Sequence, residues 1–151
     1  MAELHEVDAW LAALISQLEP AARKKMLHQV AREVRRIQQA RMTEQLAPDG
    51  STWEPRRITA RTKPDRIKRK MFVKLKTTKY LKIKATSDNA EVAFVHAVQR
   101  LARVHHYGLR ERAGNRTMII KYPSRRLLGI DNETIIIIEG IMLEALQMPQ
   151  D

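Results

Sequence analysis

The chain has 151 residues, a length that suits a single domain, and its 28 Lys and Arg outnumber its 17 Asp and Glu to give a formal net charge of +11. Because it contains no cysteine, disulfides, thiolate zinc sites and cysteine nucleophiles are excluded. Hydrophobic residues make up 44% of the chain, as in a globular protein, and no apolar run reaches the roughly 18 residues of a membrane span. The acidic N-terminus lacks the basic start of a secretory signal, so we expect a soluble protein with no membrane partner.

Apolar residues at helical spacing predict two N-terminal helices. The first has an apolar face with steps of three and four residues, formed by Leu4, Val7, Leu11, Leu14 and Leu18. Pro20 then suits the first turn of a second helix, where its missing N–H removes no hydrogen bond. That helix should run from about Ala21 to Leu46, with one side formed by Leu27, Val30, Val34 and Ile37. We expect the two helices to form an antiparallel hairpin over residues 1–47.

A basic loop is expected after the hairpin. The turn sequence Ala47–Ser51 ends the second helix, and residues 48–65 are interrupted by prolines and show no periodicity. We expect an extended basic loop over this range, in which Trp53 packs on the core as the apolar anchor. A helical spacing of apolar residues then predicts a short helix over about 66–75.

Beyond this segment the pattern changes to an alternation of apolar and polar residues, which predicts strands. The expected elements are, in order, a strand at 81–85, a turn at 86–89, a second strand at 91–95 beside the first, a short helix ending at Gly108, a charged loop over 109–115 and a third strand over 117–122. Glycine at the end of the helix suits a left-handed C-cap.

The last segment, from Asp131 onward, is predicted to be a helix. Ile135–Ile138 alone would suit a buried strand, but apolar residues continue through Leu146, and Asp131 stands where a helix N-cap belongs. The helix is apolar around most of its girth, so we expect it to be buried or to lie in an interface. The fold class that follows is α+β in one domain, with an N-terminal helical hairpin, an extended basic loop, a small, mainly antiparallel sheet and a C-terminal helix; residues 66–151 form the α+β part.

Positive charge is concentrated in residues 20–84, which hold 20 basic and 5 acidic residues, whereas the rest of the chain holds 8 and 12. Such a run is stabilised by a polyanion or by an acidic partner surface, although a solvated basic face would also explain it. The residues that we expect to face this partner are Arg56, Arg57, Arg61, Lys63, Arg66, Lys68, Arg69 and Lys70. Non-specific binding of nucleic acid through these cations is the main alternative function.

No pattern typical of an enzyme is present. His105 and His106 are adjacent, so in a helix they point about 100° apart and do not chelate a metal together. The chain has no glycine-rich phosphate-binding motif and no nucleophile elbow. Its acidic residues are not clustered as a metal-dependent nuclease needs, which leaves a nuclease as a minor alternative. We therefore predict no catalytic residue, no metal site and no cofactor.

Five segments, taken in order, resemble the phage virion morphogenesis family. Together they span nearly the whole chain: Gln45–Gly50 with Trp53, Arg69–Leu75, Tyr80–Lys82, Val98–Leu109 and Tyr122–Gly129. The resemblance implies structural roles for Pro48, Asp49, Gly50, Trp53, His105, Tyr107, Gly108, Arg125, Leu127, Leu128 and Gly129. One position departs from the pattern, because His106 stands where a glutamine is expected before the Tyr-Gly pair.

The resemblance implies a structural component of the virion at the head-proximal end of the tail. Such proteins finish tail assembly and allow a filled head to join. By analogy with tail-terminator proteins it also implies a ring, expected to be hexameric to match the sixfold tail tube. The implied partners are further copies of the chain, tail tube and sheath proteins, and head-side neck or connector proteins, with contact to passing phage DNA as an alternative role of the basic run. Synthesis in the host bacterial cytoplasm is implied as well.

Overall fold

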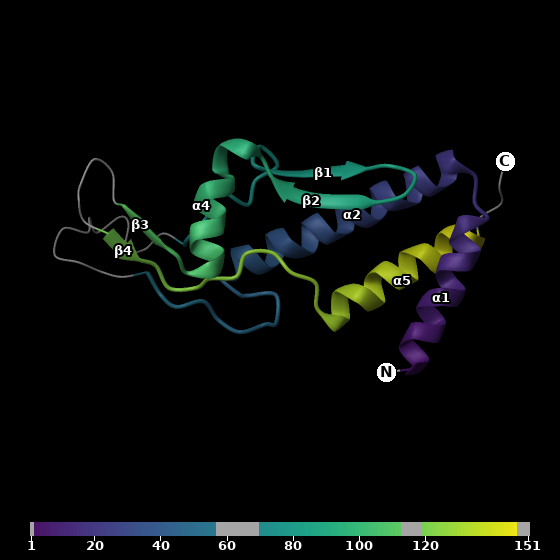
Figure 1. Ribbon diagram of the computed structural model, residues 1–151, viewed down its shortest axis with the longest axis horizontal. Helices are drawn as coiled ribbons and strands as arrows, with labels where there is room; N and C mark the ends of the chain where they lie inside the picture. The colour runs from purple at the N-terminus through teal and green to yellow at the C-terminus, as the bar shows by residue number, and fades with distance from the viewer. Residues whose placement is uncertain (1, 57–69, 113–118, 148–151) are drawn as a thin grey trace. The chain divides into compact units, whose positions relative to one another are not determined.

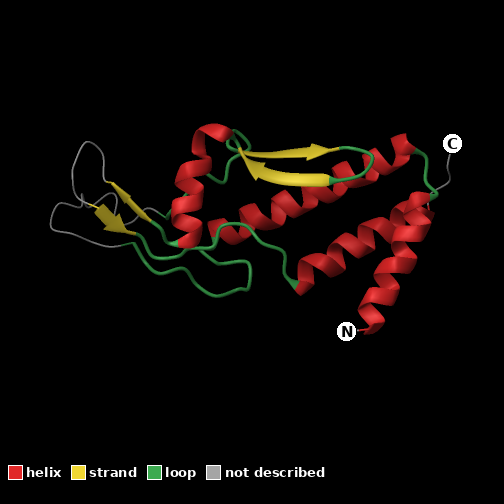
Figure 2. Ribbon diagram, in the orientation of Figure 1, coloured by secondary structure: helices red, strands yellow, loops and turns green. Residues whose placement is uncertain are grey.

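Helices stand at both ends of the chain, and two short pairs of strands come between them in sequence. A computed structural model describes residues 2–56, 70–112 and 119–147. Its elements in chain order are α1 (Ala2–Ser16), α2 (Pro20–Thr43), β1 (Leu81–Ala85), β2 (Ala90–Phe94), α4 (His96–Tyr107), β3 (Arg110–Arg112), β4 (Ile119–Lys121) and α5 (Asn132–Gln147) (Figure 1). The predicted α+β class is confirmed, as the distribution of helix and strand in Figure 2 shows.

The chain divides into two compact units. The first comprises residues 1–35, 83–92 and 132–151, and the second comprises residues 36–82 and 93–131. Helix α2 and the β1–β2 ribbon each continue from one unit into the other.

Helix faces supply the core of the first unit. Helix α1 packs against α5, and the two lie next to each other in Figure 1. Leu11 of α1 is buried, and α2 buries Met26, Val30 and Val34 at intervals of four residues. Val30 and Val34 belong to the apolar face that the sequence predicts for this helix. The helices expected at the two ends of the chain are confirmed.

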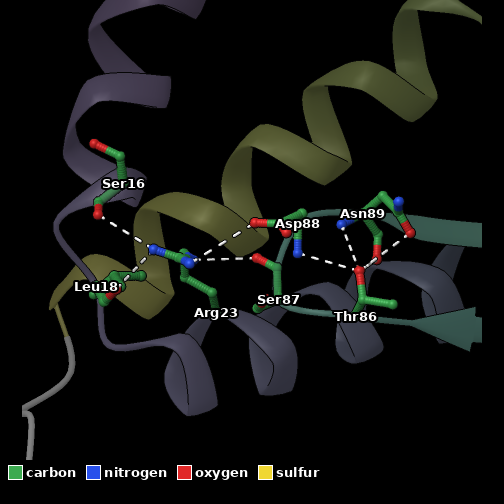
Figure 3. A network of polar contacts seen from close by, with 7 residues as sticks. All are labelled: Ser16, Leu18, Arg23, Thr86, Ser87, Asp88 and Asn89. Atoms are coloured by element: carbon green, nitrogen blue, oxygen red, sulfur yellow. Dashed lines mark hydrogen bonds and ion pairs between the residues drawn. The ribbon is translucent and has the colours of Figure 1, made fainter.

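Arg23, in the first turns of α2, fixes the corner between α1 and α2 (Figure 3). Its Nη1 donates to the carbonyl oxygens of Ser16 at 3.3 Å and Leu18 at 3.2 Å, just at the C-terminal end of α1. Its Nε donates to the carbonyl oxygen of Ser87 at 3.1 Å, and its Nη2 lies 3.8 Å from Asp88 Oδ1. The guanidinium therefore joins the end of α1 to the β1–β2 turn, where a cation also suits the dipole of α1.

The turn between β1 and β2 is closed by Thr86, also drawn in Figure 3. Thr86 Oγ1 accepts from the backbone N–H groups of Asp88 at 3.2 Å and Asn89 at 3.1 Å. The Thr86 N–H donates to the Asn89 carbonyl oxygen at 2.8 Å. The two strands run antiparallel, so the predicted strand, turn and returning strand are all present.

A second pair of strands lies in the second unit. Strands β3 and β4 pair antiparallel, with Arg110 opposite Lys121, Glu111 opposite Ile120 and Arg112 opposite Ile119. The loop predicted over 109–115 is therefore wrong at β3. The triplet Arg-Glu-Arg carries no apolar alternation, and its extended conformation comes from pairing with β4. The described strands thus make two two-stranded sheets, not the single sheet expected.

The short helix predicted over 66–75 is wrong in its described part. Residues 71–76 form turns, and Phe72 has a φ of 61°, which lies outside the right-handed helical region. The Phe72 ring instead stands edge-on between two other rings, with its centroid 5.4 Å from that of Trp53 and 4.9 Å from that of His105. Packing of this ring overrides the helical spacing of its neighbours. Residues 66–69 lie outside the described part of the chain.

Fully buried side chains form the core of the second unit, among them Met42, Leu81 and Leu127. Helix α4 ends at Gly108, whose φ of 67° and ψ of 49° place it in the left-handed region. The Gly108 N–H donates back to the carbonyl oxygen of Val104. This is the C-cap that the sequence predicts, and it turns the chain toward β3.

Candidate assembly interfaces

A tight turn after α2 begins the loop that leads to residues 56–70, which hold the eight basic residues expected to face a partner and which we call the basic segment. Gly50 has a φ of 88°, and the Asp49 carboxylate accepts from the backbone N–H of Ser51 at 2.9 Å and from its hydroxyl at 2.6 Å. These two hydrogen bonds hold the pKa of Asp49 below its usual value. The Ala47 N–H donates to the Ser51 carbonyl oxygen at 2.8 Å, so the motif residues Asp49 and Gly50 build a closed turn.

Trp53 anchors this loop, as the sequence predicts. Its side chain is buried, and its Nε1 donates to the carbonyl oxygen of Arg126 at 2.9 Å. From Trp53 a row of edge-to-face rings runs through Phe72 and His105 to Tyr122, whose centroid is 4.7 Å from that of His105. Four segments that are distant in sequence are therefore joined by aromatic contacts.

Arg125 binds the same loop at the two residues that follow Trp53. It is buried, and its guanidinium donates from Nε to the carbonyl oxygen of Glu54 at 2.8 Å and from Nη2 to that of Pro55 at 3.1 Å. Its own backbone N–H donates to the His105 carbonyl oxygen at 2.8 Å. Arg125 thus fixes the backbone of the residues directly before the basic segment to helix α4.

The other end of the basic segment is held by Gln45. Its Oε1 accepts from the Met71 N–H at 2.8 Å, and its Nε2 donates to the Met71 carbonyl oxygen at 3.0 Å and to that of Met42 at 2.7 Å. The Gln45 carbonyl oxygen also accepts from the Trp53 N–H at 2.9 Å. Both flanks of residues 57–69 are therefore tied to the same part of the second unit.

Two of the glycines to which the family resemblance assigns a structural role lie where backbone atoms or a proline ring come too close for a side chain. A Cβ on Gly129 would lie 2.7 Å from Pro48 Cγ, and a Cβ on Gly108 would lie 2.7 Å from the Ser124 nitrogen. Gly129 is further held by Gln38, whose Nε2 donates to its carbonyl oxygen at 2.7 Å. Close packing explains why these positions are glycine.

The remaining motif residues differ in their surroundings. Leu127 is fully buried, and its N–H donates to His106 Nδ1 at 3.1 Å, whereas Leu128 is half-buried. Tyr107 is exposed and lies beside the His106 ring, with centroids 4.6 Å apart. Burial, together with the charge of Arg125, lowers the pKa of His105, whose buried Nδ1 has no hydrogen-bond partner among the residues that the structure describes.

Of the eight basic residues expected to face a partner, two lie in the described part of the chain. Arg56 is half-buried beside the Arg125 anchor, and Lys70 is exposed directly before Met71. The other six lie outside the described residues: Arg57, Arg61, Lys63, Arg66, Lys68 and Arg69. The structure therefore shows how the two ends of this basic segment are anchored.

The C-terminal helix presents apolar side chains at the surface. Thr134 is its buried residue, while Ile136 and Leu143 are exposed, as is Trp10 on the adjoining helix α1. Of the two outcomes expected for α5, a buried helix or an interface helix, these exposures favour an interface.

The described residues offer neither a cluster of metal ligands nor a membrane-spanning helix. Those residues contain no group of three or more His, Asp and Glu side chains that could hold a metal ion. Among the described helices, none is both long enough and apolar enough to span a bilayer.

Sequence patterns missed the roles of Gln45, Gln38 and Arg23. Gln45 falls within the first segment of the family resemblance, which was the available signal for it. Gln38 and Arg23 are polar residues on a helix rich in polar residues, and no spacing distinguishes them. Their roles depend on backbone groups brought close by tertiary folding.

Comparisons with known proteins agree with the resemblance. The model of the phage virion morphogenesis family matches residues 2–147. Tail completion protein S of Escherichia phage P2 is 37% identical over 149 residues, which cover 97% of this chain and 99% of that protein. No solved structure gives a significant match.

Proposed function

The chain belongs to the phage virion morphogenesis family, and from this premise we propose that it is a structural protein that completes the phage tail. One observation carries the proposal: the similarity to a tail completion protein extends over nearly the full length of both chains. The buried motif residues Trp53, Arg125 and Leu127 are used for packing and for hydrogen bonds with the backbone, as suits a protein that works by assembly and not by catalysis.

We propose further that the protein forms a ring at the head-proximal end of the tail and allows the filled head to join. Its partners there are tail tube and sheath proteins on one side and neck or connector proteins on the other. The basic segment supports this role. Hydrogen bonds anchor the residues at both its ends, and its high density of positive charge would attract an acidic surface of a neighbouring protein. We favour docking to protein over binding to DNA for this segment.

Deletion of the gene tests the tail role directly. Electron microscopy of the resulting particles should show full heads beside unjoined tails or tails of irregular length. Intact virions with normal tails would overturn the proposal. Non-specific nucleic-acid binding, which the charge of residues 20–84 supports, would then become the preferred function.

Charge reversal tests the role of the basic segment. The combined substitutions Arg56→Glu, Arg57→Glu and Arg61→Glu should abolish joining of heads to tails. Because Arg56 is half-buried, a second variant that changes only Arg57 and Arg61 separates loss of docking from loss of folding. The matched control reverses exposed cations of α2, at Lys24, Lys25 and Arg32, and should leave joining intact. Normal joining in the Arg57/Arg61 variant would refute docking through this segment.

A further inference from the structure

Helix α5 has an exposed stripe formed by Glu133, Ile136, Gly140, Leu143 and Gln147, which we call the α5 stripe. These residues follow one another at steps of three and four, so they share one face of the helix. Ile136 is 67% exposed and Leu143 is 41% exposed. The stripe therefore presents two large apolar side chains to solvent, one at each side of Gly140.

Gly140 is the unusual member of the stripe. In a helix interior, glycine lowers stability by about 1 kcal/mol relative to alanine. At Gly108 and Gly129 a Cβ would meet other atoms, but at Gly140 no other atom of the described residues lies within 4 Å of the position that a Cβ would take. The described chain thus gives no internal reason for this glycine. A notch between two exposed apolar side chains admits the close approach of another chain.

The surroundings of the α5 stripe are acidic. Residues 1–19 and 132–151 together contain eight Asp and Glu and no Lys or Arg. Helix α1 packs against α5, and among the described acidic side chains Asp8 of α1 and Glu133 and Glu144 of α5 are exposed. Glu133 belongs to the α5 stripe, and Glu144 directly follows Leu143 of the stripe. Two such surfaces would repel each other, which disfavours contact with the same face of a second copy.

A surface of the opposite sign lies on the β3–β4 ribbon. Its exposed side chains are Arg110, Arg112, Ile119 and Lys121, which we call the ribbon face. Arg110 stands directly opposite Lys121, and like charges in this arrangement are destabilising. Ile119 is 60% exposed next to these cations. The ribbon face therefore combines an apolar centre with unfavourable positive charge that an acidic surface would neutralise.

We propose that the α5 stripe of one copy docks on the ribbon face of another copy. Ile136 and Leu143 would pack against Ile119, and Glu133 and Glu144 would face the cations of the ribbon. The two surfaces are different, so the contact is heterologous, and repeated contacts of this kind generate a ring when the rotation closes. This contact specifies how the subunits of the proposed ring meet, and it rests on the ring assembly given under the proposed function.

Engineered cysteines test the contact, because the natural chain has none. One protein carries Ile136→Cys and a second, distinguishable by a tag, carries Ile119→Cys. Oxidation of the mixture should give a disulfide-linked dimer of the two proteins. Either protein alone should stay largely monomeric on a denaturing gel. The matched control replaces Ile119→Cys by Leu101→Cys, at an exposed position of α4, and should give at least tenfold less mixed dimer.

Gly140→Ala gives an independent test that does not depend on a loss of folding. Helix propensity should make this variant at least as stable as the natural chain. The added methyl group should nevertheless reduce the yield of the mixed dimer at least threefold. An undiminished yield in the Gly140→Ala variant, or a yield no higher than the Leu101 control from the Ile136→Cys and Ile119→Cys pair with Gly140 retained, would overturn the contact and leave the tail role standing. Normal virions from the deletion strain would overturn the tail role and leave the contact standing.

Discussion

The side-chain amide of Gln45 pairs with the backbone of Met71 in both directions. The Met71 N–H donates to Oε1 at 2.8 Å, and Nε2 donates to the Met71 carbonyl oxygen at 3.0 Å. Gln45 itself has a φ of 60°, so its backbone conformation is strained for a residue with a side chain. The strain is maintained because the amide joins the end of α2 to the chain that follows the basic segment.

Replacing Gln45 by alanine should therefore destabilise the protein. The variant leaves the Met71 N–H and carbonyl groups without their partner, which should lower the free energy of unfolding by about 1–3 kcal/mol. Gln45→Glu should fare no better, because a carboxylate accepts from the N–H but cannot donate to the two carbonyl oxygens. Urea unfolding measures the change, with Gln29→Ala at an exposed position of α2 as the control. An unchanged midpoint for Gln45→Ala would show that the pairing contributes nothing to stability.

The close approaches at Gly108 and Gly129 predict two different responses to alanine. At Gly108 the new Cβ meets backbone atoms at 2.7 Å and the φ of 67° is unfavourable for alanine, so relief requires movement of the main chain. At Gly129 the new Cβ meets the Pro48 ring, which belongs to a surface turn. We expect Gly108→Ala to lower the unfolding temperature more than Gly129→Ala. Calorimetry of both variants decides the order, and equal or reversed shifts would contradict it.

Elements with their own periodicity could be predicted from the sequence. The apolar faces of the terminal helices, the alternation in β1 and the glycine after α4 each carry a local signal. Strand β3 could not be predicted, because the charged triplet Arg110–Arg112 becomes a strand only through its partner β4. The turn at Phe72 likewise depends on Trp53 and His105, which are distant in sequence.

The sequence could predict which segments form the candidate interfaces, but not the contacts that position those segments. The density of lysine and arginine indicated the basic segment, and the apolar character of α5 on most of its faces indicated either burial or an interface. The anchors of the basic segment could not be found in this way. Arg125 and Gln45 bind backbone carbonyl and N–H groups, and every residue supplies these regardless of its identity.

The Arg23 network predicts that its hydrogen bonds to carbonyl oxygens contribute more to stability than its ion pair with Asp88. Arg23→Ala removes hydrogen bonds to the carbonyl oxygens of Ser16, Leu18 and Ser87, and we expect a loss of about 1–2 kcal/mol in the free energy of unfolding. Asp88→Ala should change it by about 0.5 kcal/mol or less, because the Asp88 side chain is 83% exposed and 3.8 Å from Arg23. Urea titrations of both variants test the contrast. Equal losses would mean that the ion pair, and not the carbonyl hydrogen bonds, holds the corner.

The two histidines at the end of α4 predict a decrease in stability on mild acidification. Burial and the charge of Arg126 lower the pKa of His106, just as burial and Arg125 lower that of His105. In the unfolded chain both imidazoles take up protons near the ordinary pKa of about 6.5. The unfolded state therefore binds more protons than the folded state below this pH. The free energy of unfolding should fall as the pH drops from 7 through the interval below 6.5, and level off below the two folded pKa values.

His106→Gln isolates one contribution to this pH dependence. In the folded chain His106 Nδ1 accepts the Leu127 N–H at 3.1 Å, and protonation of that nitrogen would break the hydrogen bond. A glutamine amide oxygen can accept the same N–H without titrating, so this variant should keep its stability at pH 7 and lose less of it by pH 5. His106→Leu should also flatten the profile but be less stable throughout, because it offers no acceptor. Unfolding free energies measured at half-unit pH steps compare the three proteins. A His106→Gln profile as steep as that of the natural chain would assign the pH dependence to His105 or to other groups.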